Sequence, residues 1–155
     1  MHPKLGRVWA KKGEQPVVMT RSQISVRMNV FGWVDPFKGR HGMNIIERGN
    51  RKSFMDSLKI LLRKFVGKII LFVDNARWHG GDEIEMFIRK TKRLEIEYLP
   101  KYHPELNKQE HVWKLMRYEE TTNTLYDSYD DLVRSVFKKS QSWKPRRILK
   151  LCQLN

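Results

Sequence analysis

The sequence predicts an α/β fold in which a mixed sheet is flanked by helices. Residues 24–34 alternate apolar and polar side chains before becoming fully apolar, and a turn with Pro and Gly follows at 35–39. Residues 50–66 place apolar side chains at helical spacing. Residues 69–73 are five consecutive apolar residues, which is typical of a buried strand. Strands and helices alternate from there on, a pattern that favours an α/β domain.

The expected elements follow in the order β-β-α-β-α-β-α-α. Residues 43–47 pair back on the first strand as a hairpin. The first helix is capped by Asn50 or Ser53 and ends at Gly67. The remaining elements are a strand over 68–73, a helix over 80–93, a strand over 94–99 that Pro100 ends, and helices over 106–120 and 129–140.

Length and composition indicate one domain. The 155 residues are enough to bury a core, and we expect one domain over 1–155 in which 121–155 form a C-terminal helical extension with a basic tail. No apolar run is long enough to span a membrane, and no apolar segment follows the first residues as in a signal peptide. The single cysteine, Cys152, excludes an internal disulfide. A cytoplasmic location is therefore expected.

The charge of the chain indicates a polyanionic partner. Lys and Arg number 31 against 17 Asp and Glu, which gives a net charge of +14. Such a charge attracts phosphate backbones and releases their counterions. The basic residues are spread along the chain, with one dense cluster at 144–150, so the charge does not locate a binding surface. A basic interaction protein without metal chemistry, or a protein of a basic proteome, would show the same balance.

Two carboxylates are candidates for catalysis. Asp74 directly follows the apolar run 69–73, and ligands of α/β sheets bind at the carboxyl ends of such strands. A turn or helix-capping role is equally compatible with the local pattern. Glu110 lies about one turn inside the helix 106–120, where a solvated carboxylate is the alternative. Together they could hold a divalent cation, the kind of ion that drives phosphoryl transfer on nucleic acid.

A rigid aromatic segment precedes Glu110. Residues 98–113 read Tyr-Leu-Pro-Lys-Tyr-His-Pro-Glu-Leu-Asn-Lys-Gln-Glu-His-Val-Trp, and Pro100 and Pro104 restrict the path into the helix. Asn107 can cap that helix or reach the site. Together with the Asp-Asn-Ala-Arg-Trp-His segment over 74–79, this block resembles the catalytic domain of Tc/mariner-like insertion-sequence transposases of the DDE superfamily. The resemblance covers roughly residues 3–117.

The resemblance implies a fold, an activity and a cofactor. The fold would be ribonuclease H-like, with a mixed sheet flanked by helices. Asp74 and Glu110 would be the second and third acids of the catalytic triad and would bind Mg²⁺ or Mn²⁺ in a two-metal site. The implied activity is metal-dependent DNA strand cleavage and transfer at transposon ends. The implied location is the prokaryotic cytoplasm, in association with the nucleoid.

The sequence departs from the family at its N-terminus. In the family, the first catalytic Asp lies on a first, central strand, before the segment that matches residues 2–6. Asp35 is expected to be a residue of the turn with Pro and Gly, Glu14 lies in a loop, and Glu47 and Asp56 look solvated, so none of these acids has the strand context of Asp74. We therefore expect the first strand and the first ligand to be absent, the metal site to be weakened, and the chain to be inactive or impaired alone. A non-catalytic DNA-binding remnant, or a subunit of a split transposase, is the alternative.

The resemblance and the residues around the two acids also indicate binding partners and contact residues. DNA is the expected partner, with a second copy of the chain or a separately encoded N-terminal fragment as further candidates. No helix-turn-helix is evident, so DNA binding should be salt-sensitive and largely non-specific. His79 would contact substrate or orient Asp74, and the alternative is that it packs beside Trp78 as a satisfied histidine. Trp78 is the best candidate for base stacking. The expected site-adjacent residues are Asn75, His79 and Asn107, and the expected DNA contacts are Arg77, Trp78, Lys101, Lys108, Lys114, Arg117, Lys144, Arg146 and Arg147.

Overall fold

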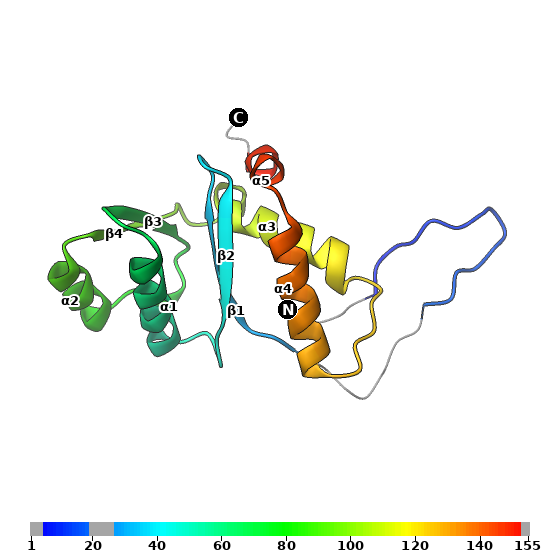
Figure 1. Cartoon of the computed structure of the whole chain (residues 1–155), viewed down its shortest axis with the longest axis horizontal. Helices are drawn as coiled ribbons and strands as arrows, with labels where there is room; N and C mark the ends of the chain where they lie inside the picture. The colour runs from blue at the N-terminus through cyan, green and yellow to red at the C-terminus, as the bar shows by residue number, and fades with distance from the viewer. Residues whose placement is uncertain (1–4, 19–26, 153–155) are drawn as a thin grey trace. The chain divides into compact units, whose positions relative to one another are not determined.

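The computed structural model describes residues 5–18 and 27–152, and its elements alternate as an α/β fold requires (Figure 1). The order is the expected one, with one more helix at the C-terminal end. The strands are β1 (Val30–Asp35), β2 (Arg40–Ile45), β3 (Ile69–Val73) and β4 (Leu94–Tyr98). The helices are α1 (Arg51–Lys64), α2 (Asp82–Thr91), α3 (Lys108–Met116), α4 (Tyr129–Ser142) and α5 (Pro145–Leu151).

Two expected elements differ in extent. Residues 24–26 of the first expected strand lie outside the described residues, and 27–29 are irregular, so β1 begins at Val30. The helix expected over 106–120 consists of a 3-10 turn η2 (Pro104–Leu106), helix α3 and a π-helical turn η3 (Arg117–Thr121). The first break lies at Asn107, whose backbone is extended and whose side chain accepts the Gln109 N–H at 3.1 Å. This capping competes with a continuous helix.

The strands form two small sheets. β1 pairs with β2, and β3 pairs with β4, with no ladder joining the two pairs within 5–18 and 27–152. The four-residue turn between β1 and β2 makes that pair an antiparallel hairpin, whereas β3 and β4 are parallel. Both strand directions therefore occur, as in a mixed α/β fold.

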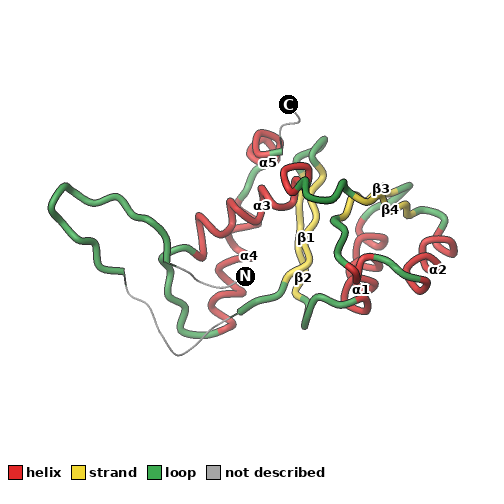
Figure 2. Tube along the Cα trace, turned by 180° about the vertical axis from the view of Figure 1, so that it is seen from behind, coloured by secondary structure: helices red, strands yellow, loops and turns green. Residues whose placement is uncertain are grey.

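The chain groups into two compact units. Unit 2 contains 29–33 and 43–110, and unit 1 contains the described parts of 1–28, 34–42 and 111–155. In unit 2, α1 and α2 lie on one side of the β3–β4 pair (Figures 1 and 2). Ile70 and Phe72 alternate to the other face of β3 and are exposed. The core of unit 2 consists of Phe31, Trp33, Phe54, Leu58, Leu61, Val73, Ile84 and Leu94.

The ends of α1 are satisfied by side chains. The Asn50 side chain accepts the Ser53 N–H at 2.9 Å, so Asn50 is the N-cap. At the other end, the Arg93 guanidinium donates to the carbonyls of Leu62 and Phe65 at 2.7 and 3.0 Å. Arg93 directly precedes β4, so this contact ties the end of α1 to the start of the strand.

Unit 1 is built around α4 and α5. Leu132, Val136, Ile148 and Cys152 are buried there. The Trp143 indole N–H donates to Glu119 at 2.9 Å, and Arg147 also pairs with Glu119. The basic cluster at 144–150, which the sequence shows only as a tail, is thus helix α5 with an apolar buried side. No helix in the described ranges is long and apolar enough to cross a membrane.

The hairpin turn depends on Asp35. Its Oδ1 accepts the backbone N–H groups of Phe37 and Lys38 at 3.1 and 3.0 Å, and its Oδ2 lies 2.8 Å from Arg40 Nη2. Burial raises the pKa of Asp35, but the hydrogen bonds from Arg40, Lys38 and Phe37 outweigh it and bring the pKa below the ordinary value of 3.8. The turn role expected for this acid is confirmed.

Asp35→Asn should therefore lower Tm at neutral pH. Because the folded pKa is depressed, the stabilisation is complete above pH 3.8 and is lost as the pH falls from there through the folded pKa. The Tm difference from wild type should shrink over that range in a circular dichroism melt. Asp56→Asn is the control, since Asp56 pairs with Lys59 on an exposed helix surface and should change Tm little. A Tm difference independent of pH would contradict the role of the carboxylate charge.

Candidate active site

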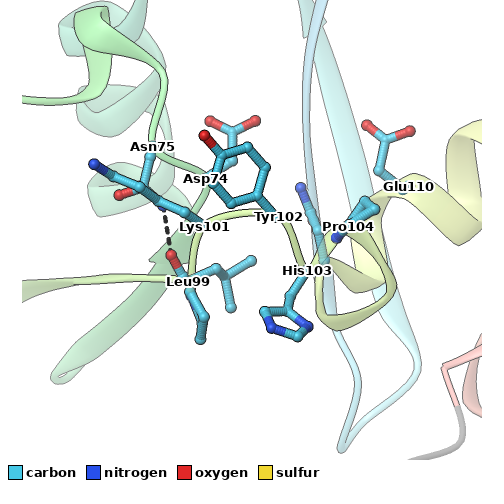
Figure 3. A pocket seen from close by; sticks show the side chains of 10 residues that line it. Asp74, Asn75, Leu99, Lys101, Tyr102, His103, Pro104 and Glu110 are labelled. Carbon is cyan, nitrogen blue, oxygen red and sulfur yellow. Dashed lines mark hydrogen bonds between the residues drawn. The ribbon is translucent and has the colours of Figure 1, made fainter.

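An open pocket of about 560 Å³ lies in unit 2 at the carboxyl ends of β3 and β4 (Figure 3). Asp74 follows β3, the loop 99–104 follows β4, and Glu110 lies in the first turn of α3. Parallel neighbours end at the same edge of a sheet, so these segments meet although they are distant in sequence. The lining residues are Asp74, Asn75, Leu99, Pro100, Lys101, Tyr102, His103, Pro104, Asn107 and Glu110.

Asp74 is half exposed and is held by one of its oxygens. Its Oδ1 accepts the Ala76 N–H at 3.1 Å and lies 2.8 Å from His79 Nδ1. His79 Nδ1 also lies 3.1 Å from the Asp74 carbonyl oxygen. Both neighbours of Nδ1 are acceptors, so this nitrogen carries the proton. His79 thereby restrains the Asp74 carboxylate, although 57% of the Asp74 side-chain surface remains accessible to solvent.

His79 is itself held by the core. It is 7% exposed, and its ring centroid lies 4.5 Å from that of Phe54 and 3.9 Å from that of Trp78. The Tyr98 hydroxyl donates to the His79 carbonyl at 3.1 Å. Two of the alternatives left open for His79, contact with Asp74 and packing beside Trp78, occur together.

A diglycine after His79 allows close approach of two side chains. The Arg51 Nε donates to the Gly80 carbonyl at 3.0 Å. Gly81 has φ of +110°, and a Cβ there would lie 2.9 Å from Arg51 Nη2. A Cβ at Gly80 would lie 2.9 Å from the Tyr98 hydroxyl. Side chains at these positions would displace the groups that support His79.

Two asparagines, Asn75 and Asn107, hold further segments that line the pocket. Asn75 Nδ2 donates to the Leu99 carbonyl at 2.5 Å, and the Leu99 N–H donates to the Val73 carbonyl at 2.8 Å. The Glu110 N–H donates to the Asn107 carbonyl at 2.9 Å, so Asn107 caps the helix that carries Glu110. In the adjoining turn, the hydrogen bond from His103 lowers the pKa of Glu105.

The carboxylate pair fits a hard divalent cation with an incomplete protein ligand set. Mg²⁺ is commonly bound by one or two carboxylates and retains waters or takes phosphate oxygens. Asp74 and Glu110 line one pocket and supply such a pair. In the part of the chain that the structure describes, no group of three or more His, Cys, Asp or Glu is arranged to hold a metal. Water or substrate oxygens would have to complete the coordination.

The other expected contact residues are distributed over both units. Lys101 lines the pocket, and Lys108 begins α3 next to it. Arg77 is exposed on the 3-10 turn η1 (Arg77–His79). Trp78 is half buried, packs edge-on against Phe54 with ring centroids 5.7 Å apart, and does not line the pocket. Unit 1 contains Lys114, Arg117, Lys144, Arg146 and Arg147.

Three residues with a structural role at the site were not singled out from the sequence. Tyr98 and Arg51 support the backbone around His79, and Tyr102 lines the pocket. Tyr98 and Tyr102 stand in the rigid segment 98–113, so the segment signalled them without indicating a role. Arg51 has no such signal, because its partner, Gly80, lies 29 positions away.

Gly81→Ala should destabilise the protein more than Gly67→Ala. Both glycines have positive φ, at +110° and +92°, and Gly81 has ψ of 166°, a combination that is essentially restricted to glycine, so both substitutions should strain the backbone by about 1–3 kcal/mol. No atom lies within 4 Å of a Cβ at Gly67, whereas Gly81→Ala must also displace Arg51 and should cost about 1 kcal/mol more. Urea unfolding measures the difference. In an Arg51→Ala background the cost of Gly81→Ala should fall by about that amount while the cost of Gly67→Ala stays the same, and an unchanged cost at Gly81 would contradict the Arg51 contact.

The chain is similar in sequence to known protein families and proteins. The sequence profile of the DDE superfamily endonuclease family matches residues 1–133. The insertion element IS630 uncharacterized 39 kDa protein of Shigella sonnei is 27% identical over 141 residues, which are 88% of this chain and 40% of that protein. The uncharacterized protein y4pE/y4sA of Sinorhizobium fredii is 27% identical over 106 residues, 67% of this chain and 76% of that protein.

Solved structures share the fold. The Mos1 mariner paired-end complex with Mn superposes with a TM-score of 0.73 and 16% identity, over 98% of this chain and 48% of that one. The Mos1 transposase catalytic domain with raltegravir and Mg superposes with a TM-score of 0.64, over 81% of this chain and 68% of that one. The chain thus spans about half the length of the Mos1 chain in the paired-end complex. The expected ribonuclease H-like α/β fold is confirmed, and the chain belongs to the DDE superfamily endonuclease family.

Proposed function

We propose that the pocket at the ends of β3 and β4 carries out metal-dependent DNA strand cleavage and transfer at the ends of an insertion element. The observation that carries this proposal is that Asp74 and Glu110, from separate elements, line one pocket in a member of the DDE superfamily endonucleases. The chain has 31 basic and 17 acidic residues, and its net charge of +14 is suited to a DNA substrate. Such an activity would operate in the prokaryotic cytoplasm, where the chromosome lies.

Four residues would have a part in this reaction. Asp74 and Glu110 would hold Mg²⁺ or Mn²⁺, and a bound ion would activate a water or 3′-hydroxyl and stabilise the leaving oxygen. His79 keeps the Asp74 carboxylate in one orientation through the 2.8 Å contact at Oδ1. Lys101, at the pocket lining, would add positive charge for a DNA phosphate.

A second candidate is a DNA-binding subunit that completes its site with another polypeptide. It is favoured by the absence of a third metal-ligating side chain beside Asp74 and Glu110 in the described ranges. A second copy of the chain or a separately encoded N-terminal fragment would supply the further acid. Metal binding and DNA cleavage by the chain alone distinguish the two candidates.

Asp74→Asn and Glu110→Gln should each weaken Mn²⁺ binding and lower Mn²⁺-dependent nicking of supercoiled plasmid by roughly 100-fold or more, because each removes a charged ligand. Electron paramagnetic resonance of free Mn²⁺ measures binding, and gel separation of nicked plasmid measures cleavage. Glu83→Gln is the control, since Glu83 is an exposed acid on α2 outside the pocket lining.

The outcomes separate the candidates. Loss of Mn²⁺ binding and of nicking in Asp74→Asn and Glu110→Gln, with neither changed in Glu83→Gln, supports the proposal that the pocket is the active site. Mn²⁺ binding that depends on Asp74 and Glu110, without nicking by the wild-type chain, favours the subunit of a split enzyme. Mn²⁺ binding unaffected by either substitution would contradict both candidates.

DNA binding should weaken steeply with salt and discriminate little between sequences, because phosphate contacts release counterions. Lys144→Ala and Arg146→Ala, on the exposed side of the α5 region, should each reduce the slope of log affinity against log salt by about 1. Lys59→Ala is the control, because Lys59 is paired with Asp56 at 2.9 Å. Fluorescence anisotropy of labelled duplexes measures the slope. Salt-independent binding with strong sequence preference would contradict this prediction.

A further inference from the structure

Tyr102 has a backbone conformation that its residue type disfavours. Among the described residues, three non-glycines have positive φ: Lys92 at +56°, Tyr102 at +64° and Asn123 at +59°. Lys92 is the left-handed C-cap of α2, with its N–H bonded to the Ile88 carbonyl. Asn is a residue type that tolerates this region. Tyr102 has neither explanation, and a bulky residue in this region is a true outlier.

The surrounding chain imposes this conformation. Before Tyr102, the Leu99 N–H and carbonyl are bonded to Val73 and Asn75 at 2.8 and 2.5 Å. After it, the His103 carbonyl accepts the Leu106 N–H at 3.1 Å. Prolines on both sides, at 100 and 104, further restrict the loop. A Gly or Asn would adopt this backbone conformation without strain. An aromatic residue here therefore lowers the stability of the fold.

The ring is presented to solvent inside the pocket. Tyr102 is 97% exposed although it lines the pocket that Asp74 and Glu110 share. Figure 3 shows its ring directed to the same side of the loop as the two carboxylates, whereas the His103 ring points the other way. Trp78, by contrast, packs against the core of unit 2 and has less free ring surface. Tyr102 therefore presents an exposed aromatic ring on the side of the pocket where the two carboxylates lie (Figure 3).

We propose that Tyr102 stacks on an unpaired nucleobase of the DNA strand next to the phosphate that is cleaved. This inference rests on the proposed function and adds a substrate-positioning residue to it. Phosphate chemistry at Asp74 and Glu110 places a backbone phosphate in the pocket, and the adjoining base then lies within reach of an exposed ring on the same side. Aromatic rings stack on any base, so the contact positions the strand without reading its sequence. It also requires a base that is free of its duplex partner.

The test uses a short duplex that ends in an unpaired 2-aminopurine, with Ca²⁺ in place of Mg²⁺ or Mn²⁺ so that the strand stays intact. Binding of the wild-type chain should quench the 2-aminopurine fluorescence. Tyr102→Phe should retain the quenching and the affinity, because the ring remains. Tyr102→Gly should lose the quenching and weaken binding by roughly 5- to 100-fold. It should keep or raise Tm, because Gly adopts positive φ readily.

The control is Tyr118, which is 78% exposed and lies outside the pocket lining. Tyr118→Leu should leave quenching and affinity unchanged, whereas Tyr102→Leu should lower both. Equal quenching and affinity in wild type and Tyr102→Gly would overturn the stacking proposal while leaving salt-dependent DNA binding and the proposed function intact. Failure of the wild-type chain to bind the duplex at any salt concentration would overturn both.

Discussion

The parallel pairing of β3 with β4 is the constraint on which the site depends. Their register runs from Ile69 opposite Leu94 to Val73 opposite Tyr98. One further hydrogen bond, from the Leu99 N–H to the Val73 carbonyl, carries the pairing to the point where both strands end. Asp74 and the loop after Leu99 consequently begin at the same edge. A shift of one residue would turn Leu94 and Ile96 of β4 away from the core and Glu95 and Glu97 toward it, so core packing and site geometry require the same register.

The core beneath this edge supplies rigidity to an exposed carboxylate. Asp74 remains open to solvent, yet its Oδ1 is bonded to a backbone N–H and approached by a histidine that is 7% exposed. That histidine packs on Phe54, a fully buried residue of α1. The chain thus places a carboxylate at the surface and its support in the interior. Such support limits the motion of the carboxylate without burying it.

The order of strands and helices and the positions of the two acids could be read from the sequence, because apolar periodicity records which faces are buried. The cap at Asn50 and the turn at Asp35 were readable for a similar local reason, since each side chain bonds to a backbone group within three residues. The break at Asn107 and the extra helix α5 were not predicted. At Asn107 a side-chain bond to the Gln109 N–H competes with continuation of the helix. In α5 the burial of Ile148, which the sequence does not show, stabilises a short helix.

By itself, the sequence determined the α/β class, the strongly positive net charge, and the positions of Asp74 and Glu110 after a strand and in the first turn of a helix, since these depend on composition and local pattern. Only the tertiary structure decided which groups surround the pair. The proton on His79 Nδ1, the bond from Arg51 to Gly80 and the left-handed backbone of Tyr102 all arise between residues that are brought together by folding or are forced by neighbours on both sides. Trp78, the aromatic residue that the sequence favoured for base stacking, packs against the core, whereas Tyr102 lies exposed in the pocket. Burial is a property of the packed chain, and residue type alone does not specify it.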